Sequence, residues 1–282
     1  MMTNSQSDES ARSHVPPVSE TSSKEIIELP WGAPLRWLRL GWRDMAAHPG
    51  TSVFFGLPFW WMALILHGVF HTGPEYSMTM ISGCLLVSPF VAMGLIDLSR
   101  RRERGIAPDF MGSLTCWRLH PGNLGILVGV LLVLALLWGR VSLVVTALFF
   151  NTAIPSDLDI MDAALDANNW EFVATYTVVG GAFAALAFSL LVVSIPMILD
   201  RDTDAITAAI TSLRVVGKNT AVMLLWAALI GLLVLVSVLL PQAAGLVAVG
   251  PLLAHASWHA YRDAVRYEHA LAPPDFRSPE PP

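Results

Sequence analysis

The chain has 282 residues, of which 54% are apolar and only 14% carry a charged side chain. Soluble globular proteins usually have about a quarter of their residues charged, so this composition excludes an ordinary soluble enzyme or binding domain. The formal net charge of −5 carries little information, because charges in a membrane protein matter by the side on which they lie. The two cysteines, Cys84 and Cys116, are too few for a disulfide framework.

The N-terminal region divides into a tail and an amphipathic segment. Residues 1–33 are polar and rich in Ser, Pro and Glu, so we expect a disordered tail without a cleavable signal peptide. From Leu35 to Ala47, apolar residues and the arginines Arg36, Arg39 and Arg43 recur at helical spacing on different faces. This pattern is typical of a helix in the membrane interface, and we expect the three arginines to contact lipid phosphates.

Six apolar stretches follow, each close to the roughly 20 residues that a helix needs to cross a bilayer. Their approximate ranges are 52–70, 78–98, 124–150, 172–199, 221–240 and 243–260. We therefore predict an all-α polytopic membrane protein, with six transmembrane helices in a membrane domain of residues 34–265. Residues 266–282 then form a short tail.

The distribution of arginine and lysine predicts the orientation of these helices. Sixteen of the seventeen cations lie in the N-terminal segment, in the second and fourth connections, and after the sixth helix. The three intervening connections have none, and the remaining cation, Arg140, lies inside the third apolar stretch. Because positive charge accumulates on the cytoplasmic side, we predict a bacterial inner-membrane protein with both termini in the cytoplasm.

Three similar units divide the membrane domain. Each expected hairpin follows a short amphipathic segment, at residues 35–47, 110–119 and 205–216. A proline precedes the cytoplasmic end of each even-numbered helix, at Pro89, Pro196 and Pro251. The pattern predicts three helical hairpins, with amphipathic interfacial helices on the cytoplasmic side.

The strongest candidates for a functional site lie at the cytoplasmic ends of the helices. His255 and His259 are four residues apart, so both imidazoles lie on one helix face and suit a metal ion with ligands from other helices. Asp97 and Asp200 occupy matching positions after the prolines of their own helices. If the hairpins pack around one axis, the four side chains converge into a metal, proton or polar-substrate site. Otherwise these side chains are helix-end charges that pair with neighbouring arginines.

Two further sets of residues are candidates. His67 and His71 also have i, i+4 spacing, near the outer end of the first helix, which suits a metal pair or hydrogen bonds to headgroups. Arg140 lies at hydrocarbon depth, where an ionised residue is a functional candidate unless its guanidinium reaches the interface. No acid stands at matching depth, so backbone carbonyls or Ser189 are its expected partners.

Four stretches of the sequence together resemble a known family. They are PLRWLRLGWRD at 34–44, GLIDLSRRRERG at 94–105, SIPMILDRDTDAITAAITSLR at 194–214 and GPLLAHASWHAYR at 250–262. The resemblance, over residues 34–265, is to an uncharacterised bacterial family of integral membrane proteins with a domain of unknown function. Some of its members are labelled cytochrome c oxidase subunit I. The family implies a six-helix membrane protein and supplies no catalytic residues.

The sequence favours a non-enzymatic role. A haem-copper oxidase catalytic subunit needs more histidines, on more helices, than His67, His71, His255 and His259, so the chain is not a complete subunit of that kind. It also lacks a phosphate-binding glycine loop, an HExxH motif and a Gly-x-Ser-x-Gly elbow. No cofactor is required by the sequence.

These observations lead to a hypothesis about function. We hypothesise a non-catalytic scaffold, accessory or assembly component of a membrane complex, with a respiratory oxidase as one candidate complex. The alternatives are a small transporter or channel that uses Arg140 and the Asp/His cluster, and a metal-dependent membrane enzyme. The expected partners are the lipid bilayer and other membrane-protein subunits. Nucleic acid is not expected, because each basic cluster has a membrane counterpart.

Overall fold

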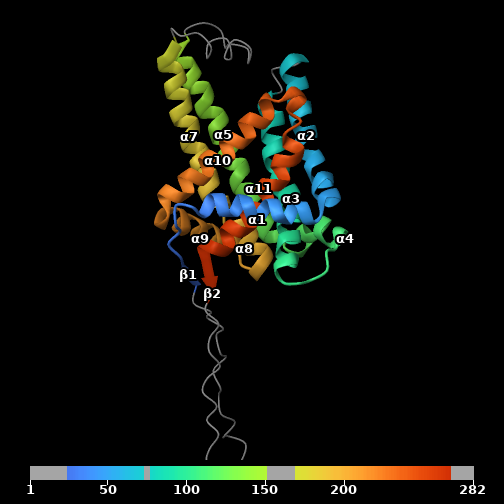
Figure 1. Cartoon of the computed structure of the whole chain (residues 1–282). Coiled ribbons are helices and arrows are strands. Elements are labelled where there is room, and N and C mark those ends of the chain that lie inside the picture. The colour runs from blue at the N-terminus through green and yellow to red at the C-terminus, as the bar shows by residue number, and fades with distance from the viewer. Residues whose placement is uncertain (1–23, 73–76, 151–168, 268–282) are drawn as a thin grey trace, which may run out of the picture. The chain divides into compact units, whose positions relative to one another are not determined.

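The computed structural model describes residues 24–72, 77–150 and 169–267. Its helices are α1 (Ala33–Ala47), α2 (Pro49–Thr72), α3 (Ser77–Glu103), α4 (Phe110–Leu114), α5 (Pro121–Phe149), α7 (Trp170–Leu191), α8 (Ser194–Arg201), α9 (Ala205–Lys218), α10 (Thr220–Leu239) and α11 (Leu246–Ala264). The short helices η2 (Cys116–Leu119) and η4 (Pro241–Ala243) and the paired strands β1 (Lys24–Ile26) and β2 (Val265–Tyr267) complete it. The predicted all-α fold is confirmed for the described residues, apart from this small sheet (Figure 1).

The chain divides into two compact units, one of which is the helical unit Ile26–Val265. The other contains the two chain ends, of which residues 1–23 and 268–282 of the predicted tails lie outside the described part. Within the helical unit, the side chain of Asn219 holds the segment before α1. Its Nδ2 donates to the carbonyl of Ile27 at 3.0 Å, and its Oδ1 accepts from the N–H of Leu29 at 2.8 Å. The packed part of this unit therefore begins before residue 34.

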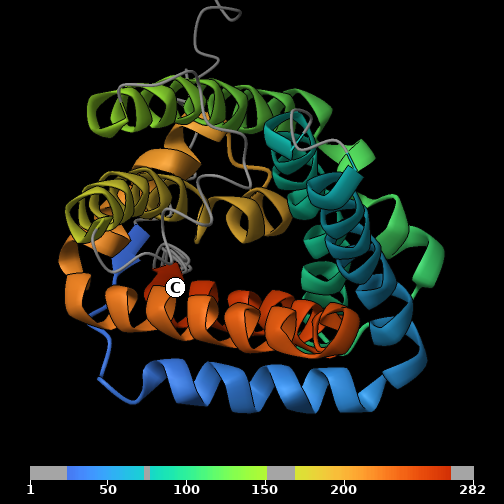
Figure 2. The same cartoon turned by 90° about the horizontal axis from the view of Figure 1, so that it is seen from above.

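Three helix pairs make up the helical unit: α2 packs against α3, α5 against α7, and α10 against α11. Helix α11 also packs against α1, α2 and α3, and Figure 2 shows α1 running along one edge beside it. Glycines allow the closest approaches. A Cβ atom on Gly41 of α1 would lie 2.8 Å from the backbone N of Ala256, and one on Gly56 of α2 would lie 2.1 Å from the carbonyl oxygen of Val247. Small residues at helix crossings are typical of membrane bundles.

The fourth predicted span is divided in the structure. Helix α7 ends at Leu191 and α8 begins at Ser194. The cause is Pro196, which has no N–H and whose ring would collide with the carbonyl of Val192 in a continuous helix. The N–H of Val193, at the break, donates to Oγ of Ser212 in α9 at 3.2 Å. The sequence indicated a proline near this helix end. It did not indicate that the helix breaks there, or that a side chain of α9 accepts a hydrogen bond from the backbone at the break.

Four described segments are long and apolar enough to cross a membrane: Pro49–Val69, Pro121–Phe149, Trp170–Arg201 and Thr220–Leu239. At most 39% of the apolar window of any of them is buried, so most of their apolar side chains face outwards, as helices solvated by lipid tails do. Helices α3 and α11 occupy the positions of the second and sixth predicted spans but are not among the four. The C-terminal part of α11 has lower hydropathy because it carries His255, His259, Arg262 and Asp263.

The largest fully buried side chains lie near the C-terminal end of α11. Trp258 and Tyr261 of α11 and Met197 of α8 are at most 1% exposed. Trp37 of α1 and Trp226 of α10 meet edge to face, with ring centroids 5.5 Å apart. The core therefore lies beside the charged helix ends, and it positions the polar residues described next.

Candidate functional site

The last turns of α3 form the centre of a layer of polar side chains. Successive residues of a helix point in different directions, so the stretch from Asp97 to Arg104 reaches α1, α4, α8 and α11. We call the set the polar layer. Its members are Asp44, Ser52, Asp97, Ser99, Arg100, Arg101, Arg102, Glu103, Arg104, Ser113, Asp200, His255, Trp258, His259, Tyr261 and Arg262.

Asp97 is fully buried and accepts from three side chains. Arg101 pairs with it at 2.7 Å, Arg100 pairs with its other oxygen, and the hydroxyl of Ser113 in α4 donates at 2.8 Å. Arg100 also donates to the carbonyl of Leu199 in α8. Asp97 thus fixes α3 to α4 and, through Arg100, to α8. Buried carboxylates with such partners are costly to disturb, because removing one partner leaves an unpaired charge.

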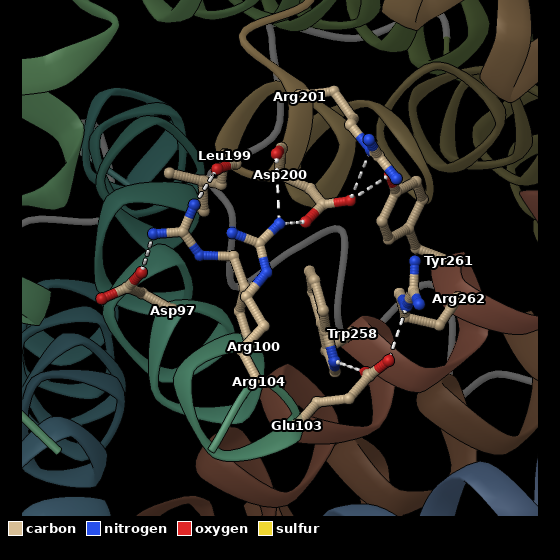
Figure 3. Close-up of polar contacts among 10 residues, drawn as sticks. All are labelled: Asp97, Arg100, Glu103, Arg104, Leu199, Asp200, Arg201, Trp258, Tyr261 and Arg262. Atoms are coloured by element: carbon tan, nitrogen blue, oxygen red, sulfur yellow. Dashed lines mark hydrogen bonds and ion pairs between the residues drawn. The ribbon is translucent and has the colours of Figure 1, made fainter. Parts of the chain in front are cut away.

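Asp200 joins three helices. Its side chain is 2% exposed and pairs with Arg104, the residue directly after α3, while Arg201 lies 3.3 Å from the second carboxylate oxygen. The same oxygen accepts from the hydroxyl of Tyr261 in α11 at 2.8 Å. Figure 3 shows Asp200 between Arg104 on one side and Tyr261 on the other. This single carboxylate therefore ties the end of α8 to both α3 and α11.

Glu103 makes a second contact between α3 and α11. Its carboxylate accepts from the indole N–H of Trp258 at 2.7 Å and from Nε of Arg262 at 2.8 Å (Figure 3). The guanidinium of Arg262 also lies 5.9 Å from the ring centroid of Trp258. Both partners come from one turn of α11, so the end of α11 is held at two points.

Asp44 of α1 is the acid that the sequence analysis missed. It accepts from the hydroxyl of Ser99 at 2.5 Å, from Nε2 of His259 at 2.8 Å and from Arg102 at 3.0 Å. Burial raises its pKa, but the hydrogen bonds from His259 and Ser99 outweigh burial, and the pKa lies below its ordinary value. Asp44 therefore stays ionised and ties α1 to α3 and α11.

His255 is held between two serines. Its Nδ1 lies 2.8 Å from Oγ of Ser99, and its Nε2 lies 3.4 Å from Oγ of Ser52 at the start of α2. Because Ser99 gives its one proton to Asp44, Nδ1 of His255 must be the donor in that contact. The tautomer with the proton on Nδ1 leaves Nε2 as an acceptor beside the hydroxyl of Ser52, whose single proton is shared between this nitrogen and the carbonyl of Met45 at 3.5 Å. His255 is 1% exposed, so this chain of hydrogen bonds runs through the interior.

The four residues predicted to converge all lie in the polar layer, but in separate groups. Asp97 lies among arginines of α3, Asp200 between Arg104 and Tyr261, and the two histidines share the Asp44 and Ser99 network. In the part of the chain that the structure describes, no three His, Cys, Asp or Glu side chains are placed to hold a metal ion. What the arrangement does is join helix ends.

The arginines predicted to contact lipid differ from one another. Arg36 pairs with Asp263 of α11 at 2.5 Å, while its side chain stays 52% exposed. Arg39 and Arg43 are exposed on α1, and no acceptor from residues 24–72, 77–150 or 169–267 lies at either guanidinium. Only one histidine of the candidate pair His67 and His71 has a described side chain. His67 is exposed on α2, whereas the side chain of His71 lies outside the described part of the chain.

Arg140 is exposed on α5, on the face opposite the buried positions Leu127 and Val145. It lies about 28 Å along the axis from the first residue of α5, at 1.5 Å per residue. The expected partner Ser189 donates within its own helix. Ser189 is also roughly 20 Å along α7 from Tyr176, whose hydroxyl contacts Ser142 near Arg140. Ser189 is therefore not placed to pair with Arg140.

The four apolar segments define a multi-pass integral membrane protein. Residues 77–200, from the first residue of α3 to Asp200, match the family model described as predicted integral membrane protein (DUF2189), a domain of unknown function. No curated protein and no solved structure matches the chain. The family description contains no reference to a cytochrome oxidase.

The polar-layer residues that were missed had only a weak signal in the sequence. Asp44 and Ser99 stand in two of the stretches that carry the family resemblance, PLRWLRLGWRD and GLIDLSRRRERG. Each is one polar residue among several, and Ser52 stands at the edge of an apolar run. Their contacts depend on how α1, α2, α3 and α11 pack together.

Proposed function

We propose that the protein is a non-catalytic scaffold of a membrane complex. The observation that carries this proposal is that the acids of the polar layer are engaged between different helices, as Asp97, Asp200 and Asp44 illustrate. Such contacts hold helix ends at constant positions, which suits a structural component better than a site that exchanges ligands. A respiratory oxidase stays a candidate complex on the sequence resemblance alone.

We also propose six transmembrane helices, with α3 and α11 as the second and sixth spans. Helix α3 has 27 residues and α11 has 19, close to the roughly 20 that a bilayer requires. With six spans, the ends of α3, α8 and α11 all lie on one side, together with α1 and α9. This side carries most of the arginines and is the proposed cytoplasmic face of a bacterial inner membrane.

The exposed face of α5 is the proposed contact surface for the partner subunit. Gly125, Gly129, Leu136 and Arg140 share this face, and nothing lies within 4 Å of a Cβ atom built on either glycine. Small residues let a second helix approach closely, and an arginine at hydrocarbon depth favours a carboxylate on that helix. The proposed occupant is therefore a transmembrane helix with an acid at the depth of Arg140.

Site-specific photocrosslinking in native membranes tests this proposal. A photoreactive amino acid at Leu136 should give one discrete protein adduct, whereas the same residue at Leu235, which is similarly exposed on α10, should not. The adduct should weaken in Arg140→Gln and persist in Arg140→Lys, because the charge is retained. A protein without adducts from Leu136 that migrates alone on a native gel contradicts the scaffold proposal.

The transporter and enzyme alternatives have less support from the geometry. A path through the bundle would meet the side of α5 that packs on α7, whereas Arg140 lies on the opposite side. A metal-dependent enzyme would need Asp97 and Asp200 to leave arginine partners that bind them within 4 Å. Uptake assays on vesicles that contain the purified protein would separate transport from scaffolding.

A further inference from the structure

Besides Arg118 in η2 and Arg140 on α5, three arginines of the helical unit lie outside the polar layer and have no acceptor in the described part of the chain. They are Arg39 and Arg43 on α1 and Arg214 on α9, and all three are exposed. By contrast, the arginines at the ends of α3 and α11 pair with carboxylates. The positive charge of these three side chains on α1 and α9 is therefore free to meet a ligand.

Helix α1 has three different faces. Trp37, Gly41 and Asp44 are buried against the rest of the protein. A second face exposes Leu35 and Trp42, which are 64% and 57% accessible. At 100° per residue, Arg39 and Arg43 lie along one edge of this apolar strip, between it and the buried face.

Helix α9 repeats this arrangement. Ala208 and Val215 are buried, while Ile206 and Ile210 are 64% and 44% accessible on another face. Arg214 lies about 80° from Ile206 around the axis, on the same side of the apolar strip as Arg39 and Arg43 in α1. Around the axis of each helix, the buried face, the exposed apolar strip and the basic edge therefore follow one another in the same order.

The connections place these two helices at the ends of membrane spans. Only His48 separates α1 from α2, and only Asn219 separates α9 from α10. Because α2 and α10 contain candidate membrane spans, α1 and α9 must lie where those spans enter the bilayer. An exposed apolar strip beside a basic edge is stable at that depth, since the strip meets acyl chains and the arginines meet headgroups.

We propose that α1 and α9 lie in the surface of the leaflet on the polar-layer side, and that Arg39, Arg43 and Arg214 bind phosphates of anionic phospholipids. The apolar strips, with Leu35, Trp42, Ile206 and Ile210, enter the same leaflet. This inference rests on the membrane spans and not on the scaffold role, so each can fail without the other.

Native mass spectrometry of the full chain tests the arginine part. The purified protein is titrated with phosphatidylglycerol or phosphatidylcholine in mild detergent, and the bound lipids are counted. Phosphatidylglycerol should bind more tightly, and Arg39→Gln, Arg43→Gln and Arg214→Gln should each weaken it roughly fivefold. The matched control Arg36→Gln should change the preference less than the other three variants, because Asp263 already neutralises that half-exposed guanidinium. Equal affinity for the two lipids in the wild-type protein overturns the proposal.

Spin labelling in vesicles tests the apolar part and distinguishes lipid from a protein partner or water. A nitroxide replaces Leu35 or Ile210 in a Cys84→Ala background, in vesicles that contain phosphatidylglycerol and only this protein. Burial, with the charge of Asp97 adding to it, raises the pKa of Cys116 to about 12, so this thiol stays unlabelled near neutral pH. Both labels should be accessible to oxygen and protected from a polar nickel chelate. Access to the chelate, or protection from both reagents, contradicts a lipid-facing strip.

Discussion

Two groups of arginines in this protein look alike in the sequence and behave differently in the structure. Arg100, Arg101 and Arg104 at the end of α3 pair with buried carboxylates, whereas Arg39 and Arg214 on α1 and α9 face outwards. An arginine of either group counts the same in the charge asymmetry that predicts the orientation of the helices. The difference teaches that a cluster of cations beside a membrane span can stabilise helix packing as well as contact lipid.

Local geometry explains part of this difference. Asp97 precedes Arg100 and Arg101 by three and four residues, so all three lie on one side of α3. Arg39 and Arg43 have a four-residue spacing as well, but Asp44 of the same helix points away from them into the protein. The buried face of each helix therefore decides which cations find a carboxylate.

The largest effect is expected from Asp97→Ala, which leaves Arg100 and Arg101 without their buried partner. We expect the free energy of unfolding to fall by about 3–5 kcal/mol, as when one member of a buried ion pair is removed. Denaturant unfolding in detergent would measure it. Arg39→Gln is the matched control and should change stability by less than about 0.5 kcal/mol. Similar losses in both variants would remove the distinction between the two groups.

Gly56→Ala tests whether α11 has to lie against α2 to hold the polar layer. The new methyl group would fall 2.1 Å from the carbonyl oxygen of Val247, so the two helices must separate. We expect a loss of about 1–3 kcal/mol, measured by the same unfolding transition. Gly231→Ala, with nothing within 4 Å of the added carbon, should be neutral or slightly stabilising. A stable Gly56→Ala variant would contradict the close crossing.

Asp44→Asn gives a smaller effect that depends on pH. The pKa of Asp44 is lowered from its ordinary value of 3.8, so its stabilisation is fully present above that value. The stabilisation is lost as pH falls through the pKa of the folded state, where the carboxylate takes up a proton. We expect Asp44→Asn to cost about 1.5 kcal/mol near neutral pH and nothing in acid. Thermal melts in detergent from neutral pH down through the folded-state pKa, which lies below 3.8, would show whether the two curves converge.

Much of the helical framework could be predicted from the sequence. The amphipathic segments at 35–47 and 205–216 correspond closely to α1 and α9, because periodic apolar residues and their caps are local signals. The break between α7 and α8 was harder to predict from the sequence. Its position depends on Pro196, but its stability depends on the hydroxyl of Ser212 from another helix.

The candidate site was predicted less well than the helices. Proline offsets placed Asp97, Asp200, His255 and His259 at one end of the bundle, which is where the structure has them. Their partners could not be read from spacing, because helix rotation and crossing angle decide which side chains touch. Asp44 shows this most clearly, since it accepts from residues of α3 and α11 that are distant in sequence.

The central claim is that the polar layer couples helix ends energetically, and a double-mutant cycle between Arg104 and Asp200 tests it most directly. The single variants Arg104→Gln and Asp200→Asn and their combination are compared by denaturant unfolding in one detergent. We predict a coupling free energy of about 0.5–3 kcal/mol for this pair, which joins α3 to α8. A cycle of Arg39→Gln with Asp200→Asn should be additive. Additivity in both cycles would contradict the claim that these arginines hold the helices together.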